Sequence, residues 1–322
     1  GLRRALEHDL AILQQFLQSD LPVIAASDLI SDFKPTGNEA AHDFAAVYSI
    51  FTPPTPVKRL ADRLSDYYLK HGSGKTAGFA AFRWDGESGL TGVRHLDRIS
   101  LDDIVGYEQQ KETLRKNTEA FLAGKPANNV LLVGARGTGK SSSVKGLINR
   151  YFAEGLRLVE VHKHQLSDLN KIIAALRGRS QKFIVFLDDL SFEESEIEFK
   201  HLKSLIEGGV EAKPDNVLLY ATSNRRHLIK ESWADREGVQ DIHSADSVQE
   251  KISLSDRCGI TLTYQAPDQD EYLRIVRALA ERHGVGMEEE ELRRRALRWE
   301  LSHSGRSGRV AQQFIRHVIG NG

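Results

Sequence analysis

The stretch Gly134-Ala-Arg-Gly-Thr-Gly-Lys-Ser141 decides how this chain folds. It satisfies the pattern G-x-x-x-x-G-K-[ST] at every position. An apolar run at residues 130–133 leads straight into it and is typical of a buried parallel strand, while residues 142–151 are compatible with a helix. This order of strand, glycine-rich loop and helix predicts a phosphate-binding loop, because the loop N–H groups and the positive end of the helix dipole then point at phosphate oxygens.

Each polar position of the loop has a predicted role in holding a nucleotide. Lys140 would neutralise the β- and γ-phosphates, and Ser141 would hold Mg2+. The residues predicted to contact the nucleotide are Gly134, Ala135, Arg136, Gly137, Thr138, Gly139, Lys140, Ser141 and Ser142. Residues 72–76 end in a similar Gly-Lys-Thr sequence, but Leu69 stands where the first glycine belongs, so we interpret that stretch as the turn that ends a helix.

Length and composition are those of an ordinary globular protein. The 322 residues suffice for about two domains, and a net charge of −1 provides no global field that would recruit nucleic acid. The single cysteine, Cys258, excludes an intrachain disulfide and fits a reducing cytoplasm. No apolar run approaches the roughly 20 residues that cross a bilayer, and the first residues do not form a signal peptide. We therefore expect a cytoplasmic protein that does not associate with membranes.

From residue 101 onward, apolar runs alternate with helix-compatible segments. The predicted strands are residues 130–133, 156–161, 183–187, 217–221 and 260–264, and the predicted helices between them lie near residues 107–124, 142–151, 168–176 and 199–206. This alternation indicates an α/β fold, with a five-stranded parallel sheet and helices on both faces. Three helical segments follow Pro267, where Asp268 and Glu271 match a capping box. We expect these segments to form a separate helical lid.

The N-terminal part has a different pattern. It is predicted to be mostly helical, with apolar stripes near residues 6–17, 40–51 and 57–70. Residues 79–84 fit either a short strand or an aromatic anchor onto the next domain, and the turn-rich residues 85–92 indicate a linker. The predicted domains are an N-terminal partner or accessory domain (1–98), a nucleotide-binding α/β domain (99–265) and a helical lid (266–322).

Polar side chains stand at the C-terminal ends of two of the predicted strands. Asp188 is expected to bind Mg2+ together with Ser141, and Asp189 is expected to polarise the water that attacks the γ-phosphate. Asn224 ends the following strand, where a neutral amide could orient the same water. The alternative for Asn224 is an ordinary turn residue.

Other polar groups have plainer interpretations. Glu193 and Glu194 are rival candidates for the base, but they lie beyond the strand end. His162 and His164 have no cysteine or carboxylate partners at metal-ligand spacing. The basic run at residues 293–298 is interpreted as a solvated helix face, with a nucleic-acid patch as the alternative.

These motifs resemble those of AAA+ ATPases, in the same order along the chain, and the resemblance covers residues 101–322. The matching segments are 103–106 (adenine pocket), 134–141 (Walker A), 183–189 (Walker B), 221–225 (sensor 1, with Asn224), 254–260 (arginine finger) and 305–309 (sensor 2). More narrowly, the chain resembles a bacterial family of uncharacterised AAA+ proteins. Three segments carry this resemblance: Val-Gly-Ala-Arg-Gly-Thr-Gly-Lys-Ser-Ser, Asp-Asp-Leu-Ser-Phe-Glu-Glu and Ala-Thr-Ser-Asn-Arg-Arg-His-Leu. That narrower resemblance takes in the N-terminal part as well.

The resemblance implies roles for further residues. Ile104 and Val105 would contact adenine. Arg257 would be a finger inserted into the site of a neighbouring subunit; the alternative is that it pairs with a nearby acid. Arg309 would reach the γ-phosphate from the lid as sensor 2, with Arg306 as the alternative. The predicted catalytic residues are thus Asp189, Asn224, Arg257 and Arg309.

The leading hypothesis is a Mg2+-dependent ATP hydrolase that remodels or loads a macromolecular partner as a homo-oligomer. The alternatives are a switch in which slow hydrolysis times release, and a DNA-associated initiator or helicase loader. The second acid of the Walker B segment is Asp189, where many AAA+ members have glutamate, and this departure puts the hydrolysis rate in question. Besides ATP or ADP and Mg2+, the expected partners are further copies of the chain and an unidentified protein client, and nucleic acid is not favoured.

Overall fold

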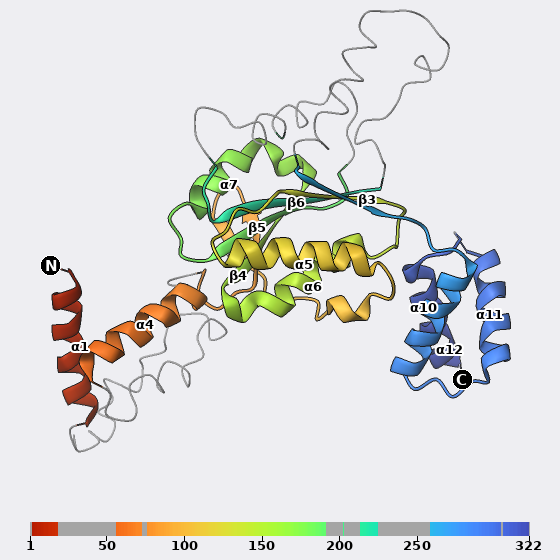
Figure 1. Ribbon diagram of the computed structural model, residues 1–322, viewed down its shortest axis with the longest axis horizontal. Helices are drawn as coiled ribbons and strands as arrows, with labels where there is room; N and C mark the ends of the chain where they lie inside the picture. Colours follow the sequence, from red (N-terminus) through yellow and green to blue (C-terminus); the bar gives the residue numbers. More distant parts are fainter. Residues whose placement is uncertain are drawn as a thin grey trace, which may run out of the picture.

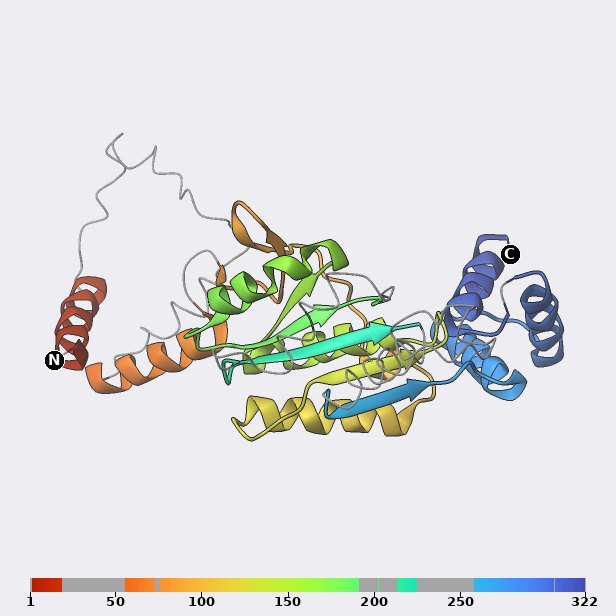
Figure 2. The same ribbon diagram turned by 90° about the horizontal axis from the view of Figure 1, so that it is seen from above.

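A seven-stranded sheet forms the centre of the protein. The computed structural model describes residues 2–18, 56–72, 76–190, 202, 213–224, 258–303 and 305–321. The strands lie in the order β2-β1-β4-β5-β6-β3-β7. Helices cover both faces of the sheet, the N-terminal helices extend from one end of the molecule, and the C-terminal helices lie at the other end (Figure 1). Figure 2 shows the same separation from above.

Five neighbouring strands of the sheet are parallel and correspond to the five predicted strands. They are β4 (Leu156–Val161), β5 (Lys182–Leu187), β6 (Val217–Ser223), β3 (Val130–Gly134) and β7 (Ile260–Tyr264). β3, which leads into the glycine-rich loop, lies between β6 and β7. All seven residues of β6 are buried, as expected for a parallel strand that helices cover on both faces. The predicted α/β class is confirmed.

Two further strands extend the sheet, so the prediction of five strands was too low. β1 (Ala81–Asp85) pairs parallel to β4, and β2 (Gly89–Gly92) pairs antiparallel to β1. The strand alternative for residues 79–84 is therefore confirmed, whereas the linker interpretation of residues 85–92 is wrong because they complete a hairpin. The sheet thus begins before residue 99, and β1 pairs with the backbone groups that β4 would otherwise expose at its edge.

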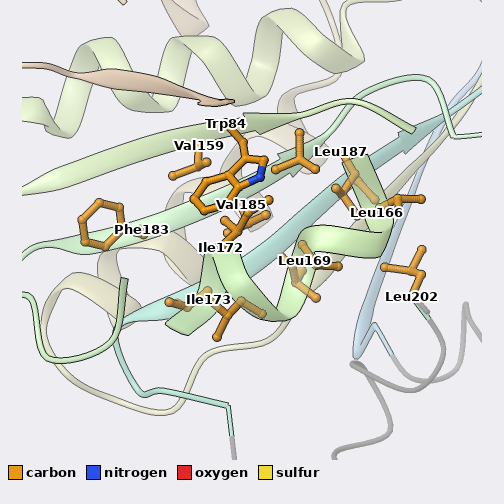
Figure 3. Packing of buried hydrophobic residues seen from close by; sticks show 14 of the residues in the cluster. Trp84, Val159, Leu166, Leu169, Ile172, Ile173, Phe183, Val185, Leu187 and Leu202 are labelled. Atoms are coloured by element: carbon orange, nitrogen blue, oxygen red, sulfur yellow. The ribbon is translucent and has the colours of Figure 1, made fainter. Parts of the chain in front are cut away.

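Helices on the two faces bury alternate residues of each strand. α7 (Leu169–Leu176) covers one face, and α5 (Glu108–Leu122) and α6 (Lys140–Tyr151) cover the other (Figure 1). Short 3-10 helices lie at residues Leu101–Asp103 (η2), Phe152–Glu154 (η3) and Lys163–Asp168 (η4). Figure 3 shows the cluster on the α7 face, whose labelled members are Trp84, Val159, Leu166, Leu169, Ile172, Ile173, Phe183, Val185, Leu187 and Leu202. These two hydrophobic layers hold the strand ends that carry the candidate site.

The N-terminal helices α1 (Leu2–Gln18) and α4 (Val57–His71) pack on each other. Their small core consists of Leu10, Leu60, Ala61 and Leu64. Gly72 ends α4, and its N–H donates to the Tyr68 carbonyl over 2.9 Å, which agrees with the predicted helix-ending turn. The helix predicted at residues 40–51 lies outside the described residues, as does the helix predicted at residues 199–206 apart from Leu202.

A buried arginine attaches α4 to the sheet. The Arg157 side chain, on β4, is 1% exposed and donates to the carbonyls of Lys70 (2.7 Å), Phe152 (2.9 Å) and Leu156 (2.8 Å). Lys70 lies in the last turn of α4 and Phe152 directly follows α6. The guanidinium therefore sits at the negative ends of two helix dipoles, which stabilise a buried cation. Burial lowers the pKa of Arg157 to about 10.

The C-terminal helices form a separate unit with its own core. They are α10 (Gln269–Arg282), α11 (Glu289–Leu301) and α12 (Gly308–Asn321), with Tyr272, Val276, Ala296, Phe314 and Ile315 in their shared core. At the start of α10, the Asp268 carboxylate accepts from the Glu271 N–H over 2.8 Å. The basic run on α11 pairs with Glu290 and Glu291 of the same helix, as expected for a solvated face. Among the described residues, no helix is long and apolar enough to cross a bilayer.

Candidate nucleotide-binding site

A pocket of about 590 Å³ lies where the glycine-rich loop, the strand ends and the helical lid meet. One wall consists of the loop and the start of α6, and a second wall of the ends of β5 and β6. The lid closes a third side through α10 and α12. The lining residues are Ile99, Asp103, Ile104, Val105, Tyr107, Arg136, Gly137, Thr138, Gly139, Lys140, Ser141, Ser142, Asp188, Asp189, Thr222, Asn224, Ile275, Leu279, Arg282, Gly308, Arg309 and Gln312.

The loop begins with a glycine that no other residue can replace. Gly134 has φ 140°, and a Cβ at this position would lie 1.9 Å from the Tyr264 carbonyl oxygen on β7. The absence of a side chain lets the chain turn sharply off β3 next to its neighbouring strand. The predicted glycine requirement of the first loop position therefore has a direct steric cause.

Lys140 holds its ammonium under the loop. Its side chain is buried, and its Nζ donates to the carbonyls of Gly134 (2.9 Å) and Ala135 (2.6 Å) and to the Asn224 Oδ1 (3.0 Å). An ammonium has three donors, and all three here meet oxygen acceptors, the same kind of group that a phosphate offers. Burial lowers the pKa of Lys140, and the nearby Asp189 carboxylate opposes that shift.

Ser141 and Asp188 form a hydroxyl–carboxylate pair at the start of α6. The Ser141 Oγ donates to the Asp188 Oδ1 over 2.6 Å, and the Thr222 Oγ1 donates to the same oxygen over 2.6 Å. Oxygen ligands of this kind suit Mg2+, which binds proteins through one or two carboxylates and keeps several waters. The two predicted ligands therefore fit Mg2+ by their chemistry and their proximity.

Asp189 and Asn224 are also brought together. The Asn224 Nδ2 donates to the Asp189 Oδ1, so both side chains reach the same point in the pocket. Asp189 has φ 54°, in the left-handed region that non-glycine residues seldom adopt. Its N–H donates to the Thr222 Oγ1 over 2.8 Å. The rival bases Glu193 and Glu194 lie outside the described residues.

Part of the pocket lining is apolar. Ile104 and Val105, predicted to contact adenine, line it together with Tyr107, Ile275 and Leu279. The Tyr107 ring stacks on the Tyr264 ring with centroids 4.8 Å apart, and its hydroxyl donates to the Gln265 carbonyl over 2.5 Å. Burial raises the pKa of Tyr107 to about 12, so this hydroxyl stays protonated. Apolar lining of this kind suits a purine base.

The C-terminal helices approach the loop through both main-chain and side-chain atoms. The Arg309 N–H donates to the Gly137 carbonyl over 3.3 Å, and a Cβ on Gly137 would lie 2.9 Å from the Ser307 Oγ. The Arg309 side chain lines the pocket, whereas the Arg306 Nε lies 2.9 Å from the Glu300 carboxylate and Arg306 is not part of the lining. Of the two predicted sensor 2 candidates, the structure therefore brings Arg309 to the site.

The remaining sequence predictions concern residues that either do not line this pocket or lie outside the described part of the chain. Arg257, the predicted arginine finger, lies outside the described residues. His162 and His164 stack on each other with centroids 5.7 Å apart. Within the part of the chain that the structure describes, no group of three or more His, Cys, Asp and Glu side chains could hold a metal ion.

Some pocket residues were not predicted. Tyr107 had only a helical apolar spacing in the sequence, and Thr222 only its place near a strand end. Arg282 lines the pocket, and its Nη1 lies 3.2 Å from the Asp103 Oδ1, which links α10 to the segment directly before Ile104. An arginine on an amphipathic helix gives no sign of such a contact, because it is equally compatible with a solvated face.

A sheet with this order of parallel strands, a phosphate-binding loop after β3, two acids after β5 and an arginine from the C-terminal helices is the arrangement of an AAA+ P-loop protein. The chain belongs to the family described as Protein of unknown function (DUF815), whose model matches residues 77–322. The predicted resemblance to an uncharacterised AAA+ family is confirmed.

Known proteins outside the family show weaker similarity. The 26S proteasome regulatory subunit 4 homolog of Saccharomyces cerevisiae is 29% identical over 36% of this chain and 30% of its own length. The structure of the Thermotoga maritima RuvB Holliday junction branch migration motor aligns with a TM-score of 0.46 at 19% identity, covering 69% of this chain and 64% of that chain. A point mutant of the same motor aligns with a TM-score of 0.48, also at 19% identity, over 69% and 65% of the two chains. The chain thus spans about a third of the curated relative and just under two thirds of these structures.

Proposed function

We propose that this protein binds ATP with Mg2+ and hydrolyses it to remodel or load a macromolecular partner. The observation that carries the proposal is the convergence of Lys140, the Ser141–Asp188 pair, the Asp189–Asn224 pair and Arg309 around one pocket. The lysine and the arginine supply positive charge, the first pair supplies metal ligands, and the second supplies a base with an orienting amide. This combination suits phosphoryl transfer to water.

Each group has one task in that reaction. Lys140 gives up its bonds to loop carbonyls and to Asn224 when phosphate oxygens take their place. Ser141 and Asp188 would hold Mg2+, and the ion would supply positive charge to the phosphate oxygens. Asp189 accepts a proton from the attacking water, and Asn224 orients that water because its amide lies beside the same carboxylate. Arg309 places charge on the γ-phosphate from the lid.

The assembly and the partner are the finer part of the proposal. The family resemblance supports a homo-oligomer in which Arg257 serves the site of a neighbouring subunit. The α1–α4 pair extends from the end of the molecule opposite the C-terminal helices, which supports a role for the N-terminal part in holding a protein client (Figure 1). The net charge of −1 disfavours nucleic acid as that client. A cytoplasmic location fits the single cysteine, whose thiol is buried.

A slow nucleotide switch is the second candidate, and the geometry of Asp189 favours it. An aspartate is one methylene shorter than the usual glutamate, and this one already bonds to Asn224. A less well-placed base slows hydrolysis, so that nucleotide state would time the release of a partner. Turnover far below once per second identifies the switch, because typical enzymes turn over near 10 per second.

The binding test compares two lysines of the same helix. Lys140→Ala should weaken Mg2+-ATP binding in a calorimetric titration by about 10²-fold or more, since a buried charge that contacts phosphate is lost. Lys145→Ala removes the same charge from α6 outside the pocket lining and should bind like the wild type. Equal affinity of the two variants would refute the assignment of the pocket.

The chemical test separates binding from hydrolysis. Asp189→Asn should bind ATP with wild-type affinity and release phosphate about 10²-fold more slowly or worse. Asp188→Ala should instead remove the Mg2+ dependence of binding. Wild-type turnover by Asp189→Asn would transfer the role of base to Glu193 or Glu194.

The assembly test uses protein concentration. Specific activity should rise as ATP-dependent oligomers form, and Arg257→Ala should be inactive alone while still binding ATP. Mixing Arg257→Ala with Lys140→Ala should restore activity, because each variant supplies what the other lacks. An arginine finger supplied by a neighbouring subunit raises the turnover rate roughly 10³- to 10⁵-fold. Activity that is independent of concentration, with a fully active Arg257→Ala, would favour a monomeric switch.

A further inference from the structure

We propose that Thr222 is a positioning residue that sets the geometry of both acids at the end of β5. It lies within the sensor 1 segment, in which only Asn224 was given a role, and it contributes neither charge nor a base. The inference rests on the proposed hydrolysis of ATP, because it concerns how Asp188 and Asp189 are held for that reaction.

The Thr222 hydroxyl joins the two acids directly. The side chain is buried on β6 at 1% exposure; its Oγ1 donates to the Asp188 Oδ1 over 2.6 Å and accepts from the Asp189 N–H over 2.8 Å. The Thr222 carbonyl also accepts from the Leu190 N–H over 2.7 Å. Three bonds from one residue therefore fix the chain where β5 ends.

The backbone of Asp189 depends on these bonds. Its φ of 54° lies in the left-handed region, which costs a non-glycine residue about 1–3 kcal/mol unless the surroundings impose it. Thr222 imposes it from both sides, through the N–H of Asp189 and the N–H of Leu190. Because side-chain direction follows the backbone dihedrals, this conformation is what aims the Asp189 carboxylate at Asn224.

Asp188 depends on the same hydroxyl once a metal is bound. Its Oδ1 accepts from both Ser141 and Thr222. If Ser141 served as a ligand of Mg2+, the bond from Thr222 would still fix the rotation of the Asp188 carboxylate. Partners of this kind, one step removed from the metal, are worth about 10- to 100-fold in metal affinity or activity. Thr222 lies opposite Leu132 of β3. Its strand, β6, lies between β3, which leads into the glycine-rich loop, and β5, which leads into the two acids.

The experiment compares three variants of the full chain. Thr222→Val keeps the shape and removes the hydroxyl, whereas Thr222→Ser keeps the hydroxyl. Thr118→Val is the matched control, because Thr118 is also fully buried and its hydroxyl bonds to the Leu114 carbonyl and to Tyr220, away from the pocket. All three are measured for kcat, KM, the Mg2+ concentration that gives half-maximal activity, and amide hydrogen exchange at residues 187–190.

Thr222→Val should lower kcat about 10- to 100-fold and raise the Mg2+ requirement, with KM for ATP changed less than about threefold. Thr222→Ser should stay within about threefold of the wild type in kcat. Thr118→Val should lower thermal stability without changing kcat or the Mg2+ requirement. Wild-type kcat in Thr222→Val, or equal losses in the Val and Ser variants, would overturn the proposal.

A wild-type protein that hydrolyses no ATP would refute the proposed function but not the positioning role of Thr222. Hydrogen exchange tests that positioning role in either case. The Asp189 amide should exchange slowly in the wild type and in Thr222→Ser, and about tenfold or more faster in Thr222→Val, because its acceptor is gone. Unchanged protection in Thr222→Val would show that the hydroxyl does not hold Asp189 and would overturn the positioning role.

Discussion

Replacing Arg157 by methionine should detach α4 from the sheet and destabilise the whole chain. Methionine has a similar length and no charge, so it leaves the carbonyls of Lys70, Phe152 and Leu156 without the guanidinium. Hydrogen bonds from a charged donor are worth about 1.5–3 kcal/mol each. The three bonds therefore contribute roughly 6 kcal/mol by this scale.

Relief of the buried charge offsets part of that loss. Burial lowers the pKa of Arg157 from 12.5 to about 10, and one pKa unit corresponds to about 1.4 kcal/mol. Removing the cation therefore relieves a desolvation cost of about 3 kcal/mol. Subtracting this from the roughly 6 kcal/mol of the three bonds gives an expected net decrease of about 3 kcal/mol in the free energy of unfolding. Arg157→Lys should lose nearly as much, because a single ammonium cannot match the planar fork that reaches three carbonyls.

Urea unfolding followed by circular dichroism measures this free energy. Arg83→Met is the matched control, since Arg83 on β1 is 66% exposed in its side chain and pairs with Glu160 of β4. An exposed pair of this kind is worth about 0–1 kcal/mol. Amide exchange should also show the last turn of α4 losing protection in Arg157→Met alone. A free energy of unfolding within about 0.5 kcal/mol of the wild type, with α4 still protected, would refute the reasoning.

Three further predictions concern the lid, the loop and the cysteine. Arg309→Ala should reduce the preference for ATP over ADP about tenfold or more, measured by calorimetry, whereas Arg306→Ala should leave that preference unchanged; equal loss of both affinities in Arg309→Ala would indicate a structural role. Gly137→Ala should lower both the thermal midpoint and the ATP affinity more than Gly124→Ala does. Both glycines have positive φ, but a Cβ on Gly137 would lie 2.9 Å from the Ser307 Oγ, whereas no atom lies within 4 Å of a Cβ on Gly124. Burial raises the pKa of Cys258 to about 11, so at pH 8 its thiolate fraction is roughly 10²-fold below that of an unfolded thiol. A disulfide reagent should therefore label the folded protein at least that much more slowly than the urea-unfolded protein, and equal rates would contradict the burial.

The parts of the fold that were predictable are those in which one physical signal dominates. Continuous apolar runs identified the five parallel strands, because helices bury both faces of such strands. The loop pattern located Lys140, and the acids after β5 followed from the strand end. The structure places these groups in one pocket, as the parallel order of the strands led us to expect.

The parts that were missed depend on pairing between distant segments. β2 reads Gly-Leu-Thr-Gly, with two glycines of low strand propensity, and only its pairing with β1 makes it a strand. Thr222 contacts Asp188 and Asp189 across 34 and 33 positions of sequence, which requires the register of β5 and β6. Arg157 shares a face of β4 with Val159 and Val161, but a single arginine in an apolar strand does not reveal that its guanidinium is buried at two helix ends.

The close approach at Gly137 also governs how movement passes from the loop to the lid. The Arg309 N–H lies 3.3 Å from the Gly137 carbonyl oxygen, and a Cβ on Gly308 would lie 3.2 Å from the same atom. A side chain between two elements absorbs a small displacement by changing rotamer, whereas main-chain atoms in direct contact transmit it. We therefore expect a shift of the loop at Gly137 to be passed directly to the start of α12 at Gly308 and Arg309.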